Sequence, residues 1–201
     1  MQANTAMLTF GQKETLTHLL EDGVAKSSHL LAKISHTPWG VMSSSLNEIP
    51  PVRLLSWFNR ETEPHIASRF KAHSDFPLDI VIFFPLSSAE AVTEAFTRPF
   101  AQKMRMIPDL VRLTVDEVSN IVAQGAIGTL ADEFKKAFIL SVPQTQKGAK
   151  AGLLGSALED YDGRTDILML SHVDLYSEGL SAQCTMVIMA NSEALRRLLP
   201  I

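Results

Sequence analysis

The sequence predicts an α+β protein, with a mainly antiparallel sheet and two long helices packed on one of its faces. Two observations lead to this class. Helical and strand-like hydrophobic patterns alternate along the 201 residues, and their order recurs in the second half at an offset of 99 residues, which places Trp39 on Phe138. The recurrence favours one domain over residues 1–201. Its half-repeats, at about 10–100 and 101–201, would be related by a pseudo-twofold axis and complete a single sheet.

The first half begins with a long amphipathic helix. Apolar residues recur every three or four positions over 12–36, and Pro38 marks the end of the pattern. Two strand-like runs at 39–44 and 52–58, a polar loop or irregular crossing at 59–77 and a buried strand at 78–84 follow. Ser87 and Glu90 have the spacing of a capping box, which predicts a short helix through residue 96.

The second half repeats this order. Its predicted elements are a long helix at 109–136, a strand at 138–142, a strand pair at 165–176 and 180–190, and a closing helix at 192–199. Residues 144–164 contain several glycines and lysines, but their spacing matches neither a Walker sequence nor a dinucleotide fingerprint. This segment is therefore predicted to be a mobile connection and not a phosphate-binding loop.

Composition excludes several functional classes. Lys plus Arg total 18 against 22 for Asp plus Glu, so the formal charge is −4, which disfavours binding to nucleic acid or to anionic lipid. The longest apolar run, 80–84, is far shorter than the ~20 residues of a membrane helix, and the start of the chain lacks a secretory signal. The one cysteine, Cys184, lies in an apolar run typical of a buried, inert thiol. These features predict a cytoplasmic protein without a membrane or nucleic-acid partner.

The second long helix carries the residues with the clearest chemical pattern. At ~100° per residue, one face collects the valines 111, 115, 118 and 122 as a buried stripe. Glu117 and Asn120 then fall together on the opposite face, with Leu113, Gln124 and Gly128 along the same exposed strip. From periodicity alone, solvated polar residues remain the commoner explanation of such a strip.

Together with Pro143, these residues resemble the motif of the CheC/CheX/FliY family of chemotaxis phosphatases. That motif is Asp or Ser, three residues, Glu, two residues, Asn, twenty-two residues and Pro. Glu117 and Asn120 have the required separation, and twenty-two residues separate Asn120 from Pro143. Leu113 occupies the first position in place of Asp or Ser. The segments 78–85 and 184–190, each followed by a helix-forming run, are also similar to the strand-to-helix joint of the family.

The resemblance implies an enzyme that accelerates hydrolysis of the phosphoaspartate of a CheY-like response regulator in two-component signalling. Asn120 would hold the attacking water, and Glu117 would meet the active-site lysine of the receiver. The Mg²⁺ ion would belong to the receiver, so the chain itself would need neither a metal nor a cofactor. Gln124 and Gly128 would lie on the partner-binding face. Other chemotaxis proteins such as CheD, and a second copy of the chain by analogy with CheX, are further implied partners.

Leu113 supports a second hypothesis from a different class. Without the acidic or hydroxyl side chain at the first motif position, the chain could be a non-catalytic module that docks a receiver domain or another component of chemotaxis or the flagellar switch. A third hypothesis is an unrelated α+β scaffold in which the motif arose by chance.

The first half would hold a degenerate copy of the site. The offset of 99 residues puts Glu14, His18, Glu21 and Ser44 at the four motif positions. His18 and Glu21 share a helix face and could form half of a metal site, but no cluster of His, Cys, Asp and Glu completes a coordination shell. A solvated pair is the favoured interpretation, and no metal site is predicted.

Overall fold

The central feature of the computed structural model is one seven-stranded antiparallel sheet. The structure describes residues 7–58, 63–73, 78–100, 107–162 and 166–199. In chain order the strands are β1 (Gly40–Ile49), β2 (Pro64–His73), β3 (Leu78–Pro85), β4 (Ile139–Leu140), β5 (Gln144–Ala149), β6 (Leu168–Ser177) and β7 (Ala182–Asn191). They are arranged as β1-β6-β7-β3-β2-β4, and β5 also pairs with β2.

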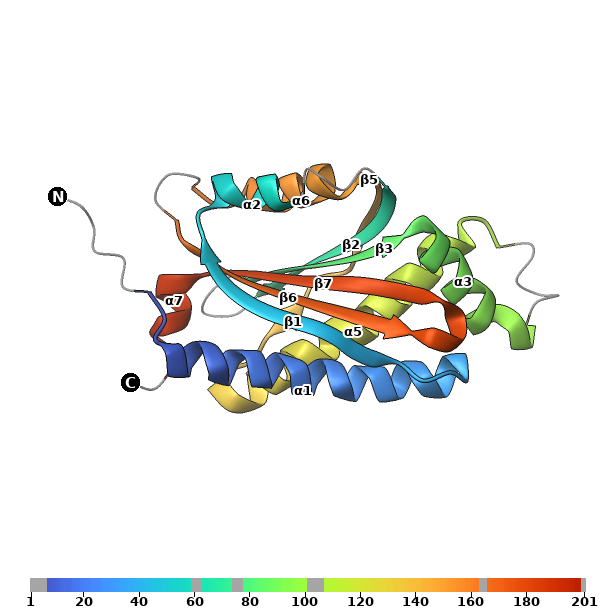
Figure 1. Ribbon diagram of the computed structural model, residues 1–201, viewed down its shortest axis with the longest axis horizontal. Coiled ribbons are helices and arrows are strands. Elements are labelled where there is room, and N and C mark those ends of the chain that lie inside the picture. Colours follow the sequence, from blue (N-terminus) through green and yellow to red (C-terminus); the bar gives the residue numbers. More distant parts are fainter. Residues whose placement is uncertain (1–6, 59–62, 74–77, 101–106, 163–165, 200–201) are drawn as a thin grey trace.

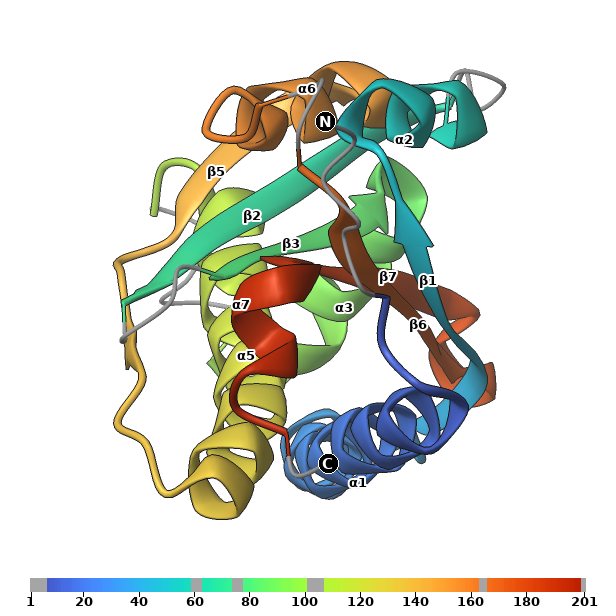
Figure 2. The same ribbon diagram turned by 90° about the vertical axis from the view of Figure 1, so that its left-hand side faces the viewer.

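Helices cover both faces of the sheet (Figures 1 and 2). The helices are α1 (Phe10–Ser35), α2 (Pro51–Phe58), α3 (Leu86–Thr97), α5 (Leu110–Phe134), α6 (Lys150–Leu158) and α7 (Ser192–Arg196). The two long helices α1 and α5 pack against each other on one face, and α2 and α6 lie side by side on the other. The predicted α+β class, with two long helices on one face of an antiparallel sheet, is therefore confirmed. Within the described ranges, no helix combines the length and the apolar character that crossing a membrane requires.

The two halves of the chain complete each other by exchanging their outer strands. β1 of the first half pairs with β6 of the second, β5 of the second half pairs with β2 of the first, and β3 and β7 meet at the centre. Each half alone would leave its hairpin with a free edge, which the strand of the other half covers. The repeated order predicted from the sequence thus builds one sheet and not two.

The central strand β3 explains why one part of the sequence is apolar without interruption. Ile80 and Ile82 face the core beneath α1 and α5, whereas Val81 and Phe83 face the core beneath α2 and α6. Because the strand is buried on both sides, the alternation of polar and apolar residues disappears. The hairpin β6–β7 and both long helices also lie close to their predicted positions.

Four sequence predictions are wrong, and each error has a physical cause. Residues 52–58 form helix α2 and not a strand, since its buried residues 51, 54 and 58 follow helical spacing. The polar stretch 59–77 contains β2. Its Arg69 makes the sequence look polar, but in the structure this charge is paired with Asp79 on β3 and with Asp160. The connection 144–164 contains β5 and α6; β5 is a polar edge strand with little hydrophobic signal. Ser87 does not cap α3, because the helix already begins at Leu86 after Pro85, which places Ser87 inside its first turn.

Candidate functional site

Helix α5 has a buried side and an exposed side, and the candidate residues lie along the exposed side. Val115, Val118 and Val122 are fully buried in the core. The residues opposite them, named here the α5 strip, are Leu113, Glu117, Asn120, Gln124 and Gly128. Leu113 is 40% exposed, Asn120 is half-buried, and the other three are exposed. The structure thus brings all five predicted residues onto one surface of one helix.

The two polar motif side chains in the α5 strip are free to meet a partner. Among the residues that the structure describes, the Glu117 carboxylate makes no ion pair and the Asn120 carboxamide makes no hydrogen bond. The neighbouring Asp116 behaves differently, because it accepts hydrogen bonds from Thr145 of β5 and, at 3.1 Å, from Arg112. Asp116 therefore anchors the helix to the sheet, whereas Glu117 and Asn120 have no structural role in holding the fold together.

Pro143 lies where the outer strand of the sheet is interrupted. It separates β4 from β5, and its missing N–H makes it unable to donate to a strand ladder. Just before it, the Ser141 N–H donates to the Lys71 carbonyl of β2 at 2.8 Å, and Ser141 Oγ accepts from the Lys71 N–H at 3.0 Å. β4 and β5 pair with β2 in registers that differ by one residue, so the chain carries a bulge between them while it stays hydrogen-bonded to β2.

This interrupted strand passes beside the motif helix. Thr145 is hydrogen-bonded to Asp116, and Lys147 lines a hollow together with the first turn of α5, so β5 and α5 run antiparallel. The motif helix and the strand that follows Pro143 are thus joined through Asp116 and Thr145.

Helices α1 and α5 cross each other, and their backbones are in contact at two glycines. A Cβ atom added at Gly125 would lie 2.5 Å from the Gly23 carbonyl oxygen, and one added at Gly23 would lie 2.5 Å from the Gly125 carbonyl oxygen. On either side, Ser27 Oγ donates to the Ile121 carbonyl at 3.0 Å and Thr129 Oγ1 donates to the Leu19 carbonyl at 2.8 Å. The small residues allow these backbone contacts, which fix the position of α5, and of the α5 strip, relative to α1.

Two exposed apolar residues of α1 lie level with the first half of α5. The hydrogen bonds at the crossing show that α1 and α5 are antiparallel, and their register places Leu30 level with Val118 and Ile34 level with Thr114. Leu30 is 51% and Ile34 is 41% exposed. These two residues and Leu113 are named here the apolar rim.

The same crossing identifies the counterpart of the site in the first half. Its two hydrogen bonds are related by an offset of 102 residues, because Ser27 corresponds to Thr129 and Leu19 to Ile121. This offset aligns Thr15 and His18 with Glu117 and Asn120. The offset of 99 residues inferred from the sequence thus differs from the structural offset by about one helical turn in these helices.

Three of the residues that the shorter offset selected are in contact. Glu21 accepts a hydrogen bond from Ser44 of β1, and His18 Nδ1 lies 3.6 Å from Glu21 Oε2. Neither His18 nor Glu21 belongs to a metal-binding arrangement: across the described ranges, no group of three or more His, Cys, Asp and Glu side chains is placed to hold a metal ion.

A buried ionic network on β2 and β3 was not anticipated from the sequence. Arg69 donates to Asp79 Oδ1 at 2.9 Å and to Asp160 Oδ2 at 2.6 Å, and the Tyr161 hydroxyl donates to Asp79 Oδ2 at 2.9 Å. Burial, followed by the neighbouring Asp79 carboxylate, raises the pKa of Tyr161. Hydrogen bonds from Lys71 and then from Arg69 lower the pKa of Asp160.

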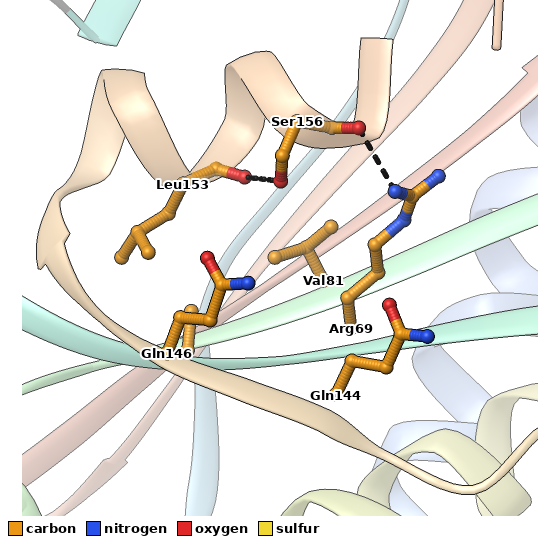
Figure 3. A pocket seen from close by; sticks show the side chains of 7 residues that line it. Arg69, Val81, Gln144, Gln146, Leu153 and Ser156 are labelled. Atoms are coloured by element: carbon orange, nitrogen blue, oxygen red, sulfur yellow. Dashed lines mark hydrogen bonds between the residues drawn. The ribbon is translucent and has the colours of Figure 1, made fainter. Parts of the chain in front are cut away.

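The hollow beside this network is too small for a ligand. Figure 3 shows the Arg69 side chain pointing along it toward α6, where a guanidinium nitrogen donates to the Ser156 carbonyl at 2.9 Å. Its volume of about 20 Å³ has room for about one water molecule. The network therefore fastens α6 and the turn after it to the sheet.

Comparison with known proteins supports the fold. No protein-family model matches the chain, and no curated protein sequence matches it significantly. Solved structures do match. FliY of Thermotoga maritima superposes with a TM-score of 0.68 at 10% identity, with 96% of each chain covered.

Two further structures show the same fold. The FliM middle domain of H. pylori has a TM-score of 0.67 at 11% identity and covers 96% of this chain and 100% of its own. CheX of Desulfovibrio desulfuricans has a TM-score of 0.56 at 12% identity and covers 87% of this chain and 99% of its own. The resemblance seen in the sequence is thus confirmed at the level of the fold, which is that of FliY, CheX and the FliM middle domain.

Proposed function

We propose that the chain is a protein-aspartylphosphate phosphatase that acts on the receiver domain of a response regulator in chemotaxis or a related two-component pathway. The observation that carries this proposal is the pair Glu117 and Asn120. Both side chains lie on the exposed side of α5, neither has a partner among the described residues, and the fold is that of CheX and FliY.

The chemistry needed for this reaction matches the two side chains. Hydrolysis of a phosphoaspartate requires a water molecule held in line with the phosphorus atom. The carboxamide oxygen of Asn120 can accept a hydrogen bond from that water, and because the group is neutral it does not repel the phosphoryl oxygens.

Glu117 serves a different purpose. Residues at i and i+3 on a helix have their Cβ atoms ~5–6 Å apart, so its carboxylate lies near the phosphoryl group and must be paired with a cation. The lysine of the receiver's active site supplies that cation in a charge-assisted hydrogen bond. The Mg²⁺ that neutralises the phosphoryl group is held by the receiver, and the apolar rim of Leu30, Ile34 and Leu113 packs against the receiver beside this contact.

A second candidate function is a binding module without catalysis. Leu113 is the specific observation in its favour, since an apolar residue at this position of the α5 strip supplies packing surface and no acceptor. The likeness to the FliM middle domain is as close in TM-score as the likeness to FliY, and FliM of H. pylori has been solved in complexes with FliG and with SpeE. The partner of such a module would be a receiver or a component of the flagellar switch.

One experiment separates the two functions. Purified receivers labelled on the phosphoaspartate are mixed with a catalytic amount of the chain, and both binding and the phosphate half-life are measured. The phosphatase shortens the half-life with multiple turnovers. Binding of the phosphorylated receiver with an unaltered half-life would establish the binding module instead, and absence of both would refute each candidate.

A further inference from the structure

A chain of hydrogen-bonded side chains ties α5 to the sheet directly before Glu117. Thr145 of β5 donates to Asp116 Oδ1, and the hydroxyl oxygens of Thr145 and Ser68 lie 2.6 Å apart. Because the single hydroxyl hydrogen of Thr145 is used on Asp116, Ser68 donates to Thr145. The sequence of bonds from Ser68 to Thr145 to Asp116, named here the hydroxyl chain, therefore runs from β2 through β5 to α5.

Both ends of the hydroxyl chain are shielded from water. Ser68 is fully buried on β2, between β3 and β5 of the sheet, and the Asp116 side chain is only 14% exposed. The second carboxylate oxygen of Asp116 is also occupied, since it accepts a hydrogen bond from Arg112 at 3.1 Å. A donor on each oxygen fixes the orientation of the carboxylate, and hydrogen bonds to a charged, largely buried acceptor are stronger than those between neutral groups at the surface.

α5 has a second directional attachment just beyond the motif pair. The Ile121 carbonyl accepts a hydrogen bond from Ser27 of α1 at 3.0 Å. The segment 117–120 thus lies between Asp116, which is fastened to β5, and Ile121, which is fastened to α1. Apolar packing is non-directional and tolerates a small rotation of a helix about its axis. Hydrogen bonds to two different elements do not, so they set the direction in which Glu117 and Asn120 leave the helix.

We propose that Asp116 and Thr145 are positioning residues for the α5 strip. They act through α5, which they hold in the rotation that directs the Asn120 carboxamide toward the attacking water. For its effect on rate, this inference rests on the proposed function. Orientation matters most for Asn120, since a displacement of ~1 Å caused by a remote substitution can cost ~10²-fold in rate. Glu117 is less sensitive, because the attraction between two charges weakens only gradually with distance.

The test measures kcat and KM for a phosphorylated receiver with variants of the hydroxyl chain. Thr145→Val keeps nearly the same shape without the hydroxyl, and it should lower kcat on the order of tenfold while KM changes less than about twofold. Thr145→Ser keeps the hydroxyl and should retain the rate. Asp116→Asn keeps an acceptor but loses the charge, so it should lower kcat by a smaller factor and makes the test independent of any one variant.

The matched control lies elsewhere in the same sheet. Thr185 of β7 donates to Asp174 Oδ1 of β6 at 2.7 Å, so Thr185→Val removes the same type of bond between a threonine and an aspartate. It should leave kcat and KM unchanged. If Thr185→Val lowers kcat as much as Thr145→Val does, the loss reflects general destabilisation and the positioning role is refuted.

A second measurement needs no receiver and separates this inference from the proposed function. Residual dipolar couplings of the Cα–Hα bonds report rotation of α5 about its axis in the free protein. Thr145→Val should change the couplings of residues 117–120, and Thr185→Val should not. An unmodified chain that leaves the phosphate half-life unaltered would refute the phosphatase, whereas changed couplings would still support the positioning role for the α5 strip. A Thr145→Val protein with full kcat, or with unchanged couplings, would overturn the inference.

Discussion

The crossing of α1 and α5 makes Gly125 a position where one methyl group is expected to be severely destabilising. In the substitution Gly125→Ala the added Cβ would lie 1.9 Å from Ser27 Oγ and 2.5 Å from the Gly23 carbonyl oxygen. The serine hydroxyl can rotate away, but the carbonyl belongs to the backbone of α1. The two helices must therefore move apart, and the hydrogen bond from Ser27 to the Ile121 carbonyl is lost or weakened.

The size of this effect can be isolated with a control on the same helix. Gly128 has no atom within 4 Å of an added Cβ, so Gly128→Ala gains helix propensity, ~0.5–1 kcal/mol, without any clash. Gly125→Ala gains the same propensity but loses ~1–3 kcal/mol to overpacking and ~1 kcal/mol with the hydrogen bond. The free energies of unfolding of the two variants should thus differ by about 2–4 kcal/mol.

Urea unfolding followed by circular dichroism measures this difference directly. In a chain of this length, each kcal/mol corresponds to ~2–4 °C in Tm, so a thermal scan gives an independent value. Gly125→Ala should be the less stable variant in both. If it proves as stable as Gly128→Ala, the backbone contact of the two long helices is not as described, and the arrangement of the α5 strip must be revised.

Four further predictions concern single side chains. Cys184 is buried and burial raises the pKa of its thiol, so it should react with DTNB only on unfolding; fast reaction of the folded protein would contradict this. The pKa of Tyr161 is raised in the folded state, so the stability it contributes is present below the ordinary tyrosine pKa of ~10 and is lost as pH rises above it. Tyr161→Phe should make the alkaline decline in Tm shallower, and an identical decline would argue against the buried contact with Asp79. Leu113→Asp, which restores the motif, should shorten the phosphate half-life of the receiver, and an unchanged half-life would show that the first position does not limit catalysis. Leu30→Asp should reduce receiver affinity on the order of tenfold with little change in stability, whereas unchanged affinity would exclude the apolar rim from the interface.

The parts of the fold that the sequence predicted are those with a clear hydrophobic pattern along the chain. The two long helices have a continuous apolar stripe, and β3 has an uninterrupted apolar run because both of its sides are buried. β2 and β5 were missed for opposite reasons. β2 is a central strand that carries Arg69, whose charge is compensated by Asp79 on the neighbouring strand and by Asp160. β5 is an edge strand whose side chains are mostly exposed.

The α5 strip and the ionic network of Arg69 differ in the same way. The α5 strip could be predicted because its residues lie on a single helix, where spacing alone decides which side chains share a face. The ionic network could not, because Arg69, Asp79 and Asp160 come from separate segments of the chain that only the tertiary structure brings together.

The most direct test of the central claim is the rate of receiver dephosphorylation with Asn120→Ala. If Asn120 holds the attacking water, this variant should lose most of the acceleration, on the order of 10²-fold, and should keep nearly full affinity for the phosphorylated receiver. His18→Ala, at the equivalent position of α1, is the matched control and should retain the full rate. An Asn120→Ala protein that dephosphorylates the receiver as fast as the unmodified chain would contradict the account.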